Sequence, residues 1–155
     1  MRIHTYERIF LWLGAATLVA CLLALTYGSL ALHLHLPTAE GTVDPQQVGT
    51  TPPFDNPGVR QLGPGRYEVV MVGRVWTFAP PEIELPAGAD VTFTMTSPDV
   101  IHGFYIERTR VNVMLIPGQI ARVRHRFDQP GEYQFFCHEY CGVGHHTMHG
   151  RIVVK

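Results

Sequence analysis

The sequence predicts a mainly β protein: an antiparallel β-sandwich of the Greek-key type, anchored by one N-terminal transmembrane α-helix. An uncharged apolar run lies near the N-terminus, apolar and polar residues alternate with a period of two from Tyr67 onward, and Pro and Gly turn signals separate the alternating segments. The 155 residues have room for one globular domain of ordinary size plus an appendage.

The apolar run covers residues 9–32 and contains no charged side chain. As a helix it would reach about 36 Å, enough to cross a hydrocarbon core of about 30 Å. Arg2 and Arg8 precede the run, whereas the uncharged His33 and His35 follow it, so the positive-inside rule places the N-terminus in the cytoplasm. We therefore predict a single-pass protein of the plasma (inner) membrane, embedded in the lipid bilayer, with the rest of the chain in the periplasm or outside the cell.

A removable signal peptide is the alternative to a membrane span. The segment Leu18-Val19-Ala20-Cys21 resembles a lipoprotein cleavage box. The apolar run continues well beyond Cys21, whereas a removed signal has an apolar region of only about 7–15 residues. The span is therefore favoured, and Cys21 is then a small apolar residue within it.

The sequence predicts three parts. Residues 1–36 form the N-terminal segment with its single transmembrane helix. Residues 37–64 are rich in Pro, Gly, Thr, Gln and Asp and show no periodicity, which is typical of a partly extended linker. Residues 65–155 form the sandwich.

The alternation is clearest in two segments of the sandwich. Apolar residues alternate with threonines over residues 91–96. Over residues 121–127, the arginines at 122, 124 and 126 alternate with Ala, Val, His and Phe. We expect two half-buried strands with the arginines on a solvated face and His125 pointing into the core. Residues 150–155 are expected to form the last strand.

Composition disfavours two classes of protein. Twelve Lys and Arg against thirteen Asp and Glu give a formal net charge of -1, so there is no basic field to hold nucleic acid. The three cysteines are too few and too unevenly placed for a disulfide framework. Cys137 and Cys141, close together near the C-terminus, need another explanation.

Residues 137–148, CHEYCGVGHHTM, concentrate metal-binding side chains. Thiolate and imidazole ligands suit zinc, copper or iron, and a thioether such as Met148 favours copper. A Cys, a His and a Met in one loop, with a further His far upstream, form the ligand set of single-copper electron-transfer sites. The upstream residue here is His102.

Cys141 does not fit a single copper ion, because two thiolates on one copper(II) favour its reduction and disulfide formation. Two thiolates that bridge two coppers leave one imidazole for each metal, with Met148 and the Glu139 carbonyl as weak ligands. Such a core shares one unpaired electron and has no open position for a substrate, which suits electron transfer. The predicted ligands are His102, Cys137, Glu139, Cys141, His145 and Met148.

Zinc is the alternative metal. Cys137, Cys141, His145 and His102 would complete a closed tetrahedral zinc site, although Met148 and the strand context favour copper. His138 is not expected to be a ligand, because adjacent residues of an extended chain point in opposite directions. His146 and His149 are expected to tune the site or to line its rim.

The pattern C-x-E-x-C-G-x-x-H-x-x-M, with D-V-x-H-x-F upstream, resembles the CuA domain of subunit II of haem-copper cytochrome oxidases, a cupredoxin fold. The resemblance covers residues 66–155. The single span and the stretches SPDVIHGF, PGEY and GRIVVK are most similar to the ba-type (B-family) oxidases. The resemblance implies the same six ligands. It also implies that cytochrome c reduces CuA and that the electron passes to haem in subunit I, where oxygen is reduced to water and protons are pumped.

The resemblance implies three further roles. An aromatic stretch near the copper assists electron uptake, and Trp76 and Phe78 occupy the corresponding place, although both also suit a plain sandwich core. The Glu139 carboxylate corresponds to one that holds magnesium at the subunit interface in the commoner oxidases, whereas the ba-type often has Gln at this position. Glu7 corresponds to a glutamate at the mouth of a proton channel of subunit I, and its alternative is a solvated carboxylate near a helix N-terminus.

The charge balance of the sandwich bears on how a partner docks, and the sequence leaves two other functions open. Residues 63–155 carry nine acidic and nine basic side chains, so we expect a largely apolar docking face for the cytochrome. The CuA subunit of a nitric oxide reductase is one alternative function. A membrane-anchored copper-binding or delivery protein is the other.

Overall fold

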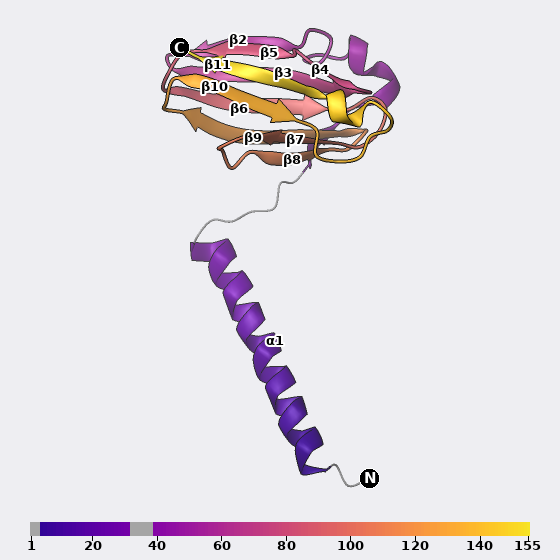
Figure 1. Cartoon of the computed structure of the whole chain (residues 1–155), viewed down its shortest axis with the longest axis vertical. Coiled ribbons are helices and arrows are strands. Elements are labelled where there is room, and N and C mark those ends of the chain that lie inside the picture. Colours follow the sequence, from indigo (N-terminus) through magenta and orange to yellow (C-terminus); the bar gives the residue numbers. More distant parts are fainter. Residues whose placement is uncertain (1–3, 32–38) are drawn as a thin grey trace. The chain divides into compact units, whose positions relative to one another are not determined.

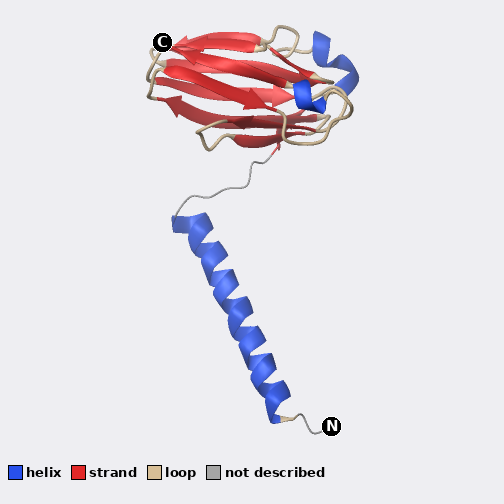
Figure 2. Ribbon diagram, viewed as in Figure 1, coloured by secondary structure: helices blue, strands red, loops and turns tan. Residues whose placement is uncertain are grey.

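The structure is a computed structural model that describes residues 4–31 and 39–155 (Figures 1 and 2). The chain divides into two compact units, Met1–Leu36 and Pro37–Lys155, which we describe separately. Arg2, His33 and His35, on which the predicted membrane orientation depends, lie outside the described residues.

The first unit is one helix, α1 (Thr5–Ala31), long and apolar enough to cross a membrane. The hydroxyls of Thr17 and Thr26 donate hydrogen bonds to the carbonyls of Leu13 and Leu22, so both polar groups are satisfied within the helix, as a lipid environment requires. The predicted N-terminal apolar helix is therefore confirmed.

The second unit is a sandwich of two β-sheets. The first sheet has the order β1 (Ala39–Thr42), β9 (Gln119–Phe127), β6 (Ala89–Thr96), β3 (Arg66–Arg74) and β2 (Gly58–Gly63), with β4 (Thr77–Ala79) also paired to β3. The second has the order β5 (Glu82–Leu85), β11 (His149–Val154), β10 (Gly131–Phe136), β7 (His102–Ile106) and β8 (Asn112–Leu115). The predicted mainly β sandwich is confirmed.

The strand pairing differs from prediction in one respect. The pairs β3–β6 and β5–β11 are parallel, whereas a wholly antiparallel sandwich was expected. The physical reason is that alternation identifies which face of a strand is buried and carries no information about the direction of its neighbour.

Alternation places aromatic rings between the sheets. Phe93 of β6 is fully buried, and Phe78 packs edge to face against Phe104 and Phe135 with ring centroids 5.6 and 5.5 Å apart. Each fully buried phenylalanine contributes about 1.5–3 kcal/mol to folding. His125 of β9 points inward as predicted and is half-buried, with its ring 4.7 Å from that of Phe127.

The predicted arginine face also exists. Each exposed arginine on β9 has a carboxylate partner, and these pairs are Arg122–Glu40, Arg124–Asp90 and Arg126–Asp128. Ion pairs this exposed contribute little to stability, so the row mainly keeps the sheet face solvated.

The predicted linker, residues 37–64, is wrong over residues 39–63. This segment contains β1, β2 and the 3-10 helix η1 (Pro45–Thr50), and it buries Val43, Val48 and Phe54 against Val70 and Val72 of β3. The neighbouring β3 residues Val69 and Met71 face the main core, so the segment covers the opposite face of the first sheet. Three apolar residues spaced five and six apart have no helix or strand period, which is why the sequence read as a linker.

Candidate metal centre

The predicted ligands lie at one end of the sandwich, mostly in the loop between β10 and β11 (Figure 1). The base of this loop is closed, because Phe136 pairs with His149 across the two strands and the Cys137 amide donates to the Met148 carbonyl at 3.0 Å. A short 3-10 helix, η2 (His145–Thr147), lies within the loop. His102 joins from the first position of β7.

The structure brings all six predicted ligands together. The Cys137 and Cys141 sulfurs lie 3.8 Å apart. His102 Nδ1 is 3.9 Å from Cys137 Sγ, and His145 Nδ1 is 3.5 Å from Cys141 Sγ. Met148 Sδ lies 3.7 Å from Cys141 Sγ, and the Glu139 carbonyl oxygen lies 3.2 Å from Cys137 Sγ. Each sulfur therefore has its own imidazole and its own weak donor.

Asp99 orients His102. One carboxylate oxygen lies 2.9 Å from His102 Nε2, so this nitrogen carries the ring proton and the Nδ1 lone pair faces Cys137. Burial raises the pKa of Asp99, but hydrogen bonds from the Val75 amide, His102, the Val100 amide and Ser97 outweigh it and hold the pKa below the ordinary carboxyl value. The sequence analysis includes Asp99 in the pattern D-V-x-H-x-F but assigns it no role, although a carboxylate three residues before His102 is a usable signal.

Both thiols are buried, and that of Cys141 is weakly acidic in the metal-free protein. Burial, together with the hydrogen bond to Cys137 and the charge of Cys137, raises the pKa of Cys141 to about 11. A thiol must lose its proton to bind a metal, so metal binding at neutral pH displaces the proton of Cys141.

Trp76 links the loop to the surface. Its indole Nε1 donates to the Cys141 carbonyl at 3.1 Å, and its side chain is 42% exposed. The indole also lies against the loop backbone, because a Cβ built on Gly144 would be 2.5 Å from the ring and one on Gly142 would be 3.0 Å away. Phe78, the second predicted aromatic, is 1% exposed and belongs to the core.

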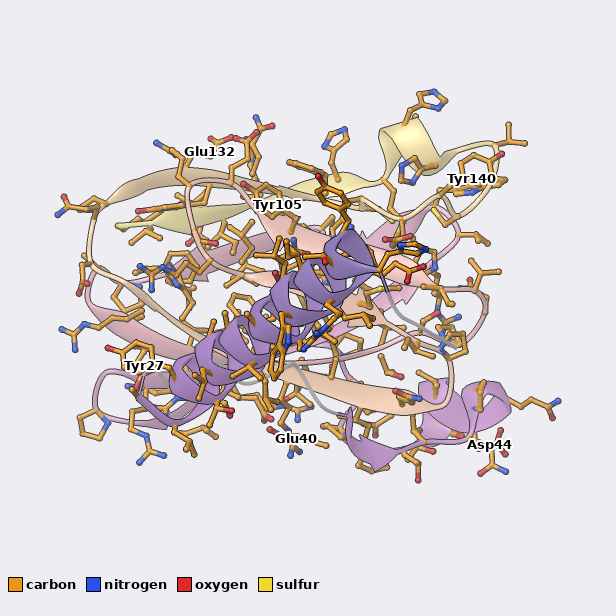
Figure 3. The ribbon with its side chains drawn as sticks, turned by 90° about the horizontal axis from the view of Figure 1, so that it is seen from below. Tyr27, Glu40, Asp44, Tyr105, Glu132 and Tyr140 are labelled. Carbon is orange, nitrogen blue, oxygen red and sulfur yellow. The ribbon has the colours of Figure 1, made fainter. Side chains whose placement is uncertain are left out.

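The other polar residues of this end lie outside the cluster. The Glu139 carboxylate is exposed and lies 3.7 Å from His138 Nδ1. Tyr140, labelled in Figure 3, is exposed, and its ring centroid is 5.9 Å from that of the ligand candidate His145. His146 is exposed in η2.

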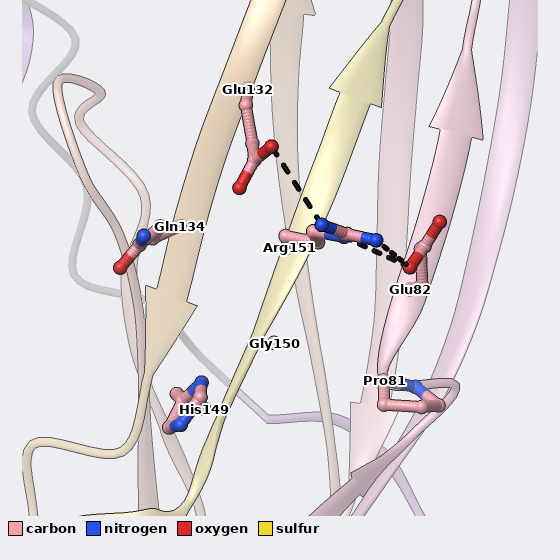
Figure 4. Close-up of a pocket in the computed structure, with 7 residues that line it drawn as sticks. All are labelled: Pro81, Glu82, Glu132, Gln134, His149, Gly150 and Arg151. Carbon is pink, nitrogen blue, oxygen red and sulfur yellow. Dashed lines mark hydrogen bonds and ion pairs between the residues drawn. The ribbon is translucent and has the colours of Figure 1, made fainter.

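His149 lines a groove on the outer face of β5, β10 and β11 (Figure 4). Arg151 bridges Glu82 at 2.7 Å and Glu132 at 3.9 Å across this groove. The arginine is held by both carboxylates, so the groove is a solvated ion-pair network separate from the sulfur cluster.

The donor set fits copper. Thiolate, thioether and imidazole ligands select copper over the hard cations, and the buried His102, Cys137 and Cys141 donor atoms all lie within 4.8 Å of one another. The His/Cys cluster in this fold therefore supports copper as the metal.

Comparison with known proteins agrees with this reading. Residues 77–155 match the family described as cytochrome c oxidase subunit II, periplasmic domain. Cytochrome c oxidase subunit 2 of Thermus thermophilus is 40% identical over 99% of this chain and 94% of that protein. A solved chain of a heme-copper terminal oxidase dimer is similar with a TM-score of 0.75 at 35% identity, covering 97% of this chain and 99% of that chain.

The fold has a more distant match as well. The periplasmic domain of cytochrome oxidase subunit II of Bradyrhizobium japonicum aligns with a TM-score of 0.53 at 21% identity, covering 57% of this chain and 83% of that chain, which supports the cupredoxin-like fold alone. The family match and the similarity over nearly the whole chain together identify the family of this chain. The chain belongs to the cytochrome c oxidase subunit II family of the haem-copper oxidases.

Proposed function

We propose that this chain is the electron-accepting subunit of a cytochrome c oxidase, in which a dinuclear copper (CuA) centre takes electrons from cytochrome c and passes them to haem in subunit I. The observation that carries the proposal is the symmetry of the sulfur pair: Cys137 and Cys141 lie 3.8 Å apart, and each faces one imidazole. When bound, a copper pair supplies reversible one-electron chemistry. Oxygen reduction to water and proton pumping then belong to the partner subunit.

The residues around the pair suit electron transfer. Cys137, Cys141 and Met148 are buried, and His102 is fully buried and fixed by Asp99. Ligands held this firmly change position little between oxidation states, which keeps reorganisation small. The protein thereby holds the metals, excludes water and leaves no place for a substrate.

Trp76 is the proposed point of electron uptake. Its exposed edge can meet a donor, and its indole hydrogen bond to the Cys141 carbonyl connects the surface to a proposed ligand. Other exposed apolar residues lie next to Trp76 in the sequence or on the segments that carry the proposed ligands, namely Val75, Val100, Ile101, Tyr140 and Val143. This rim suits cytochrome c docking through apolar contact. Phe78 supports the core beneath it.

The proposed setting is the plasma membrane. Residues 1–36, with α1 at their centre, anchor the chain in the bilayer with the N-terminus cytoplasmic, and the sandwich, which begins near residue 37, lies outside. The exposed Glu139 carboxylate is the proposed magnesium ligand at the interface with subunit I. Glu7 is the proposed proton-uptake carboxylate. Its Oε2 also accepts a hydrogen bond from the His4 amide at 2.9 Å, which is the capping role.

Glu7→Gln separates these two roles of Glu7. Gln retains an oxygen that can cap the helix and cannot carry the proton. Slower turnover of the variant complex with unchanged subunit assembly supports proton uptake, and unchanged turnover supports the cap alone.

Purification of the chain with its partners tests the function directly. We expect copper in the ratio of two ions per chain, an electron paramagnetic resonance spectrum with hyperfine coupling to two equivalent copper nuclei, and oxygen uptake with reduced cytochrome c. Zinc or a lone copper in the site would contradict the dinuclear centre. Nitric oxide consumption without oxygen uptake would identify a nitric oxide reductase, and ready loss of copper to other proteins a delivery role.

A further inference from the structure

His138 and Gly103 form a contact on the outer side of the metal centre. His102 and Cys137 point inward toward the cluster, so their neighbours Gly103 and His138 point to the outer face of the second sheet. A Cβ built on Gly103 would lie 2.6 Å from three atoms of the His138 ring. The ring therefore lies flat on the Gly103 backbone, at a distance that only glycine permits.

Gly103 also contacts the sulfur cluster. Its backbone amide donates to Cys137 Sγ at 3.4 Å, in a buried environment. A hydrogen bond to a thiolate ligand withdraws charge from the sulfur, so the sulfur stabilises the oxidised metal less and the reduction potential rises. Such a bond is stronger where water is excluded.

The His138 ring lies against Gly103, where it can exclude water from this amide. Its side chain is 26% exposed, yet its Nε2 atom is buried and has no hydrogen-bond partner within the described part of the chain. A buried unpaired nitrogen opposes folding by about 1–3 kcal/mol. The contacts that offset this cost are the packing of the ring on Gly103 and the approach of Nδ1 to the Glu139 carboxylate at 3.7 Å.

We propose that His138 is a positioning residue that covers Gly103 and thereby maintains the Gly103 amide to Cys137 sulfur hydrogen bond, which raises the reduction potential of the metal. The part that concerns the potential rests on the proposed copper function. The part that concerns the covered amide does not, so the two can fail separately.

The first test uses the metal-free, reduced full chain. In His138→Ala, the Gly103 amide is expected to exchange its hydrogen about tenfold faster or more, as read by NMR. His138→Phe keeps a ring over Gly103 and is expected to retain slow exchange. His146→Ala, which removes an exposed histidine of the same loop, is the matched control and is expected to behave as wild type. Equal exchange rates in His138→Ala and wild type would overturn the cover.

The second test is a double-mutant cycle. Gly103→Ala is expected to destabilise the metal-free chain because its methyl group meets the His138 ring. All three of the nearest atoms belong to His138, so adding His138→Ala is expected to restore most of the lost stability. A double variant no more stable than Gly103→Ala alone would overturn the contact.

The third test measures the copper-loaded chain. The reduction potential is expected to be lower in His138→Ala than in wild type and unchanged in His138→Phe. A potential that does not move, in a His138→Ala chain with fast Gly103 exchange, would overturn the tuning role while leaving the contact in place. Failure of the wild-type chain to bind copper would instead overturn the proposed function.

Discussion

Asp99→Asn is expected to weaken copper binding and to raise the reduction potential. One carboxylate oxygen of Asp99 accepts from the Val100 amide at 2.7 Å, His102 Nε2 at 2.9 Å and Ser97 Oγ at 3.1 Å. The other accepts from the Val75 amide at 2.8 Å. An asparagine has one oxygen and one amide nitrogen, so in either orientation a donor faces a donor. The less costly orientation loses the Val75 bond and the negative charge.

The size of the effect follows from this geometry. A hydrogen bond to a charged group contributes about 1.5–3 kcal/mol, and the side chain is 28% exposed, which favours the lower end. A loss of about 1.5 kcal/mol corresponds to roughly a tenfold change in an equilibrium constant. Groups that orient a metal-binding histidine typically contribute 10- to 100-fold in metal affinity. We therefore expect copper affinity to fall by roughly tenfold or more.

A competition titration of the full chain against a copper chelator measures the affinity, and voltammetry of the loaded chain measures the potential. The negative charge of Asp99 stabilises the oxidised metal, and Asp99→Asn removes this charge, so the reduction potential is expected to rise. Asp90→Asn is the control, since Asp90 forms a surface pair with Arg124 and its loss should change stability by less than about 1 kcal/mol. If Asp99→Asn binds copper as tightly as Asp90→Asn does, the orienting role of Asp99 is wrong.

Three further predictions test the fold and the centre. Burial lowers the pKa of His125, and the charge of Asp128 offsets this only in part. The unfolded chain therefore binds a proton at this residue more readily than the folded chain, so the free energy of unfolding should decrease as the pH falls below about 6.5. His125→Gln should remove this decrease, as measured by urea unfolding at pH 7 and pH 5. Gly150→Ala should destabilise the sandwich by about 1–3 kcal/mol or more, because its methyl group meets the Pro81 carbonyl and the Phe135 ring, whereas Gly63→Ala meets nothing; equal denaturation midpoints would contradict this. Cys141→Ser should leave one copper or none, and a retained two-copper paramagnetic spectrum would falsify the bridging role.

The candidate ligands could be named from the sequence because metal-binding residue types are concentrated in one short segment. Five of the six candidates lie within twelve consecutive positions, and the choice among metals depends on residue type, which the sequence states directly. The contacts that orient these ligands were not predictable in the same way. Trp76 reaches Cys141 from 65 positions earlier in the chain, and nothing local indicates that two such residues meet.

For the fold as well, local features could be predicted and long-range contacts could not. Period-two alternation identifies the strands and their buried faces, as for Phe93 on β6, but it does not identify partners, so the parallel pairs were missed. The segment 39–63 was missed because isolated apolar residues become informative only when their docking site is known. Val48 and Phe54 bury themselves on β3, an element encoded after both of them.

Residues 39–63 also matter for expression of the β-sandwich unit without α1. A fragment that starts at residue 65, where the alternating pattern starts, would lack the residues that cover Val70 and Val72. The exposed apolar face of the sheet would then promote aggregation into inclusion bodies. A fragment that starts at Ala39 retains this covering segment and should stay soluble at high concentration. The first residue of such a fragment should therefore be chosen to retain the segment that covers β3. This places it some 25 residues before the start of the alternating pattern.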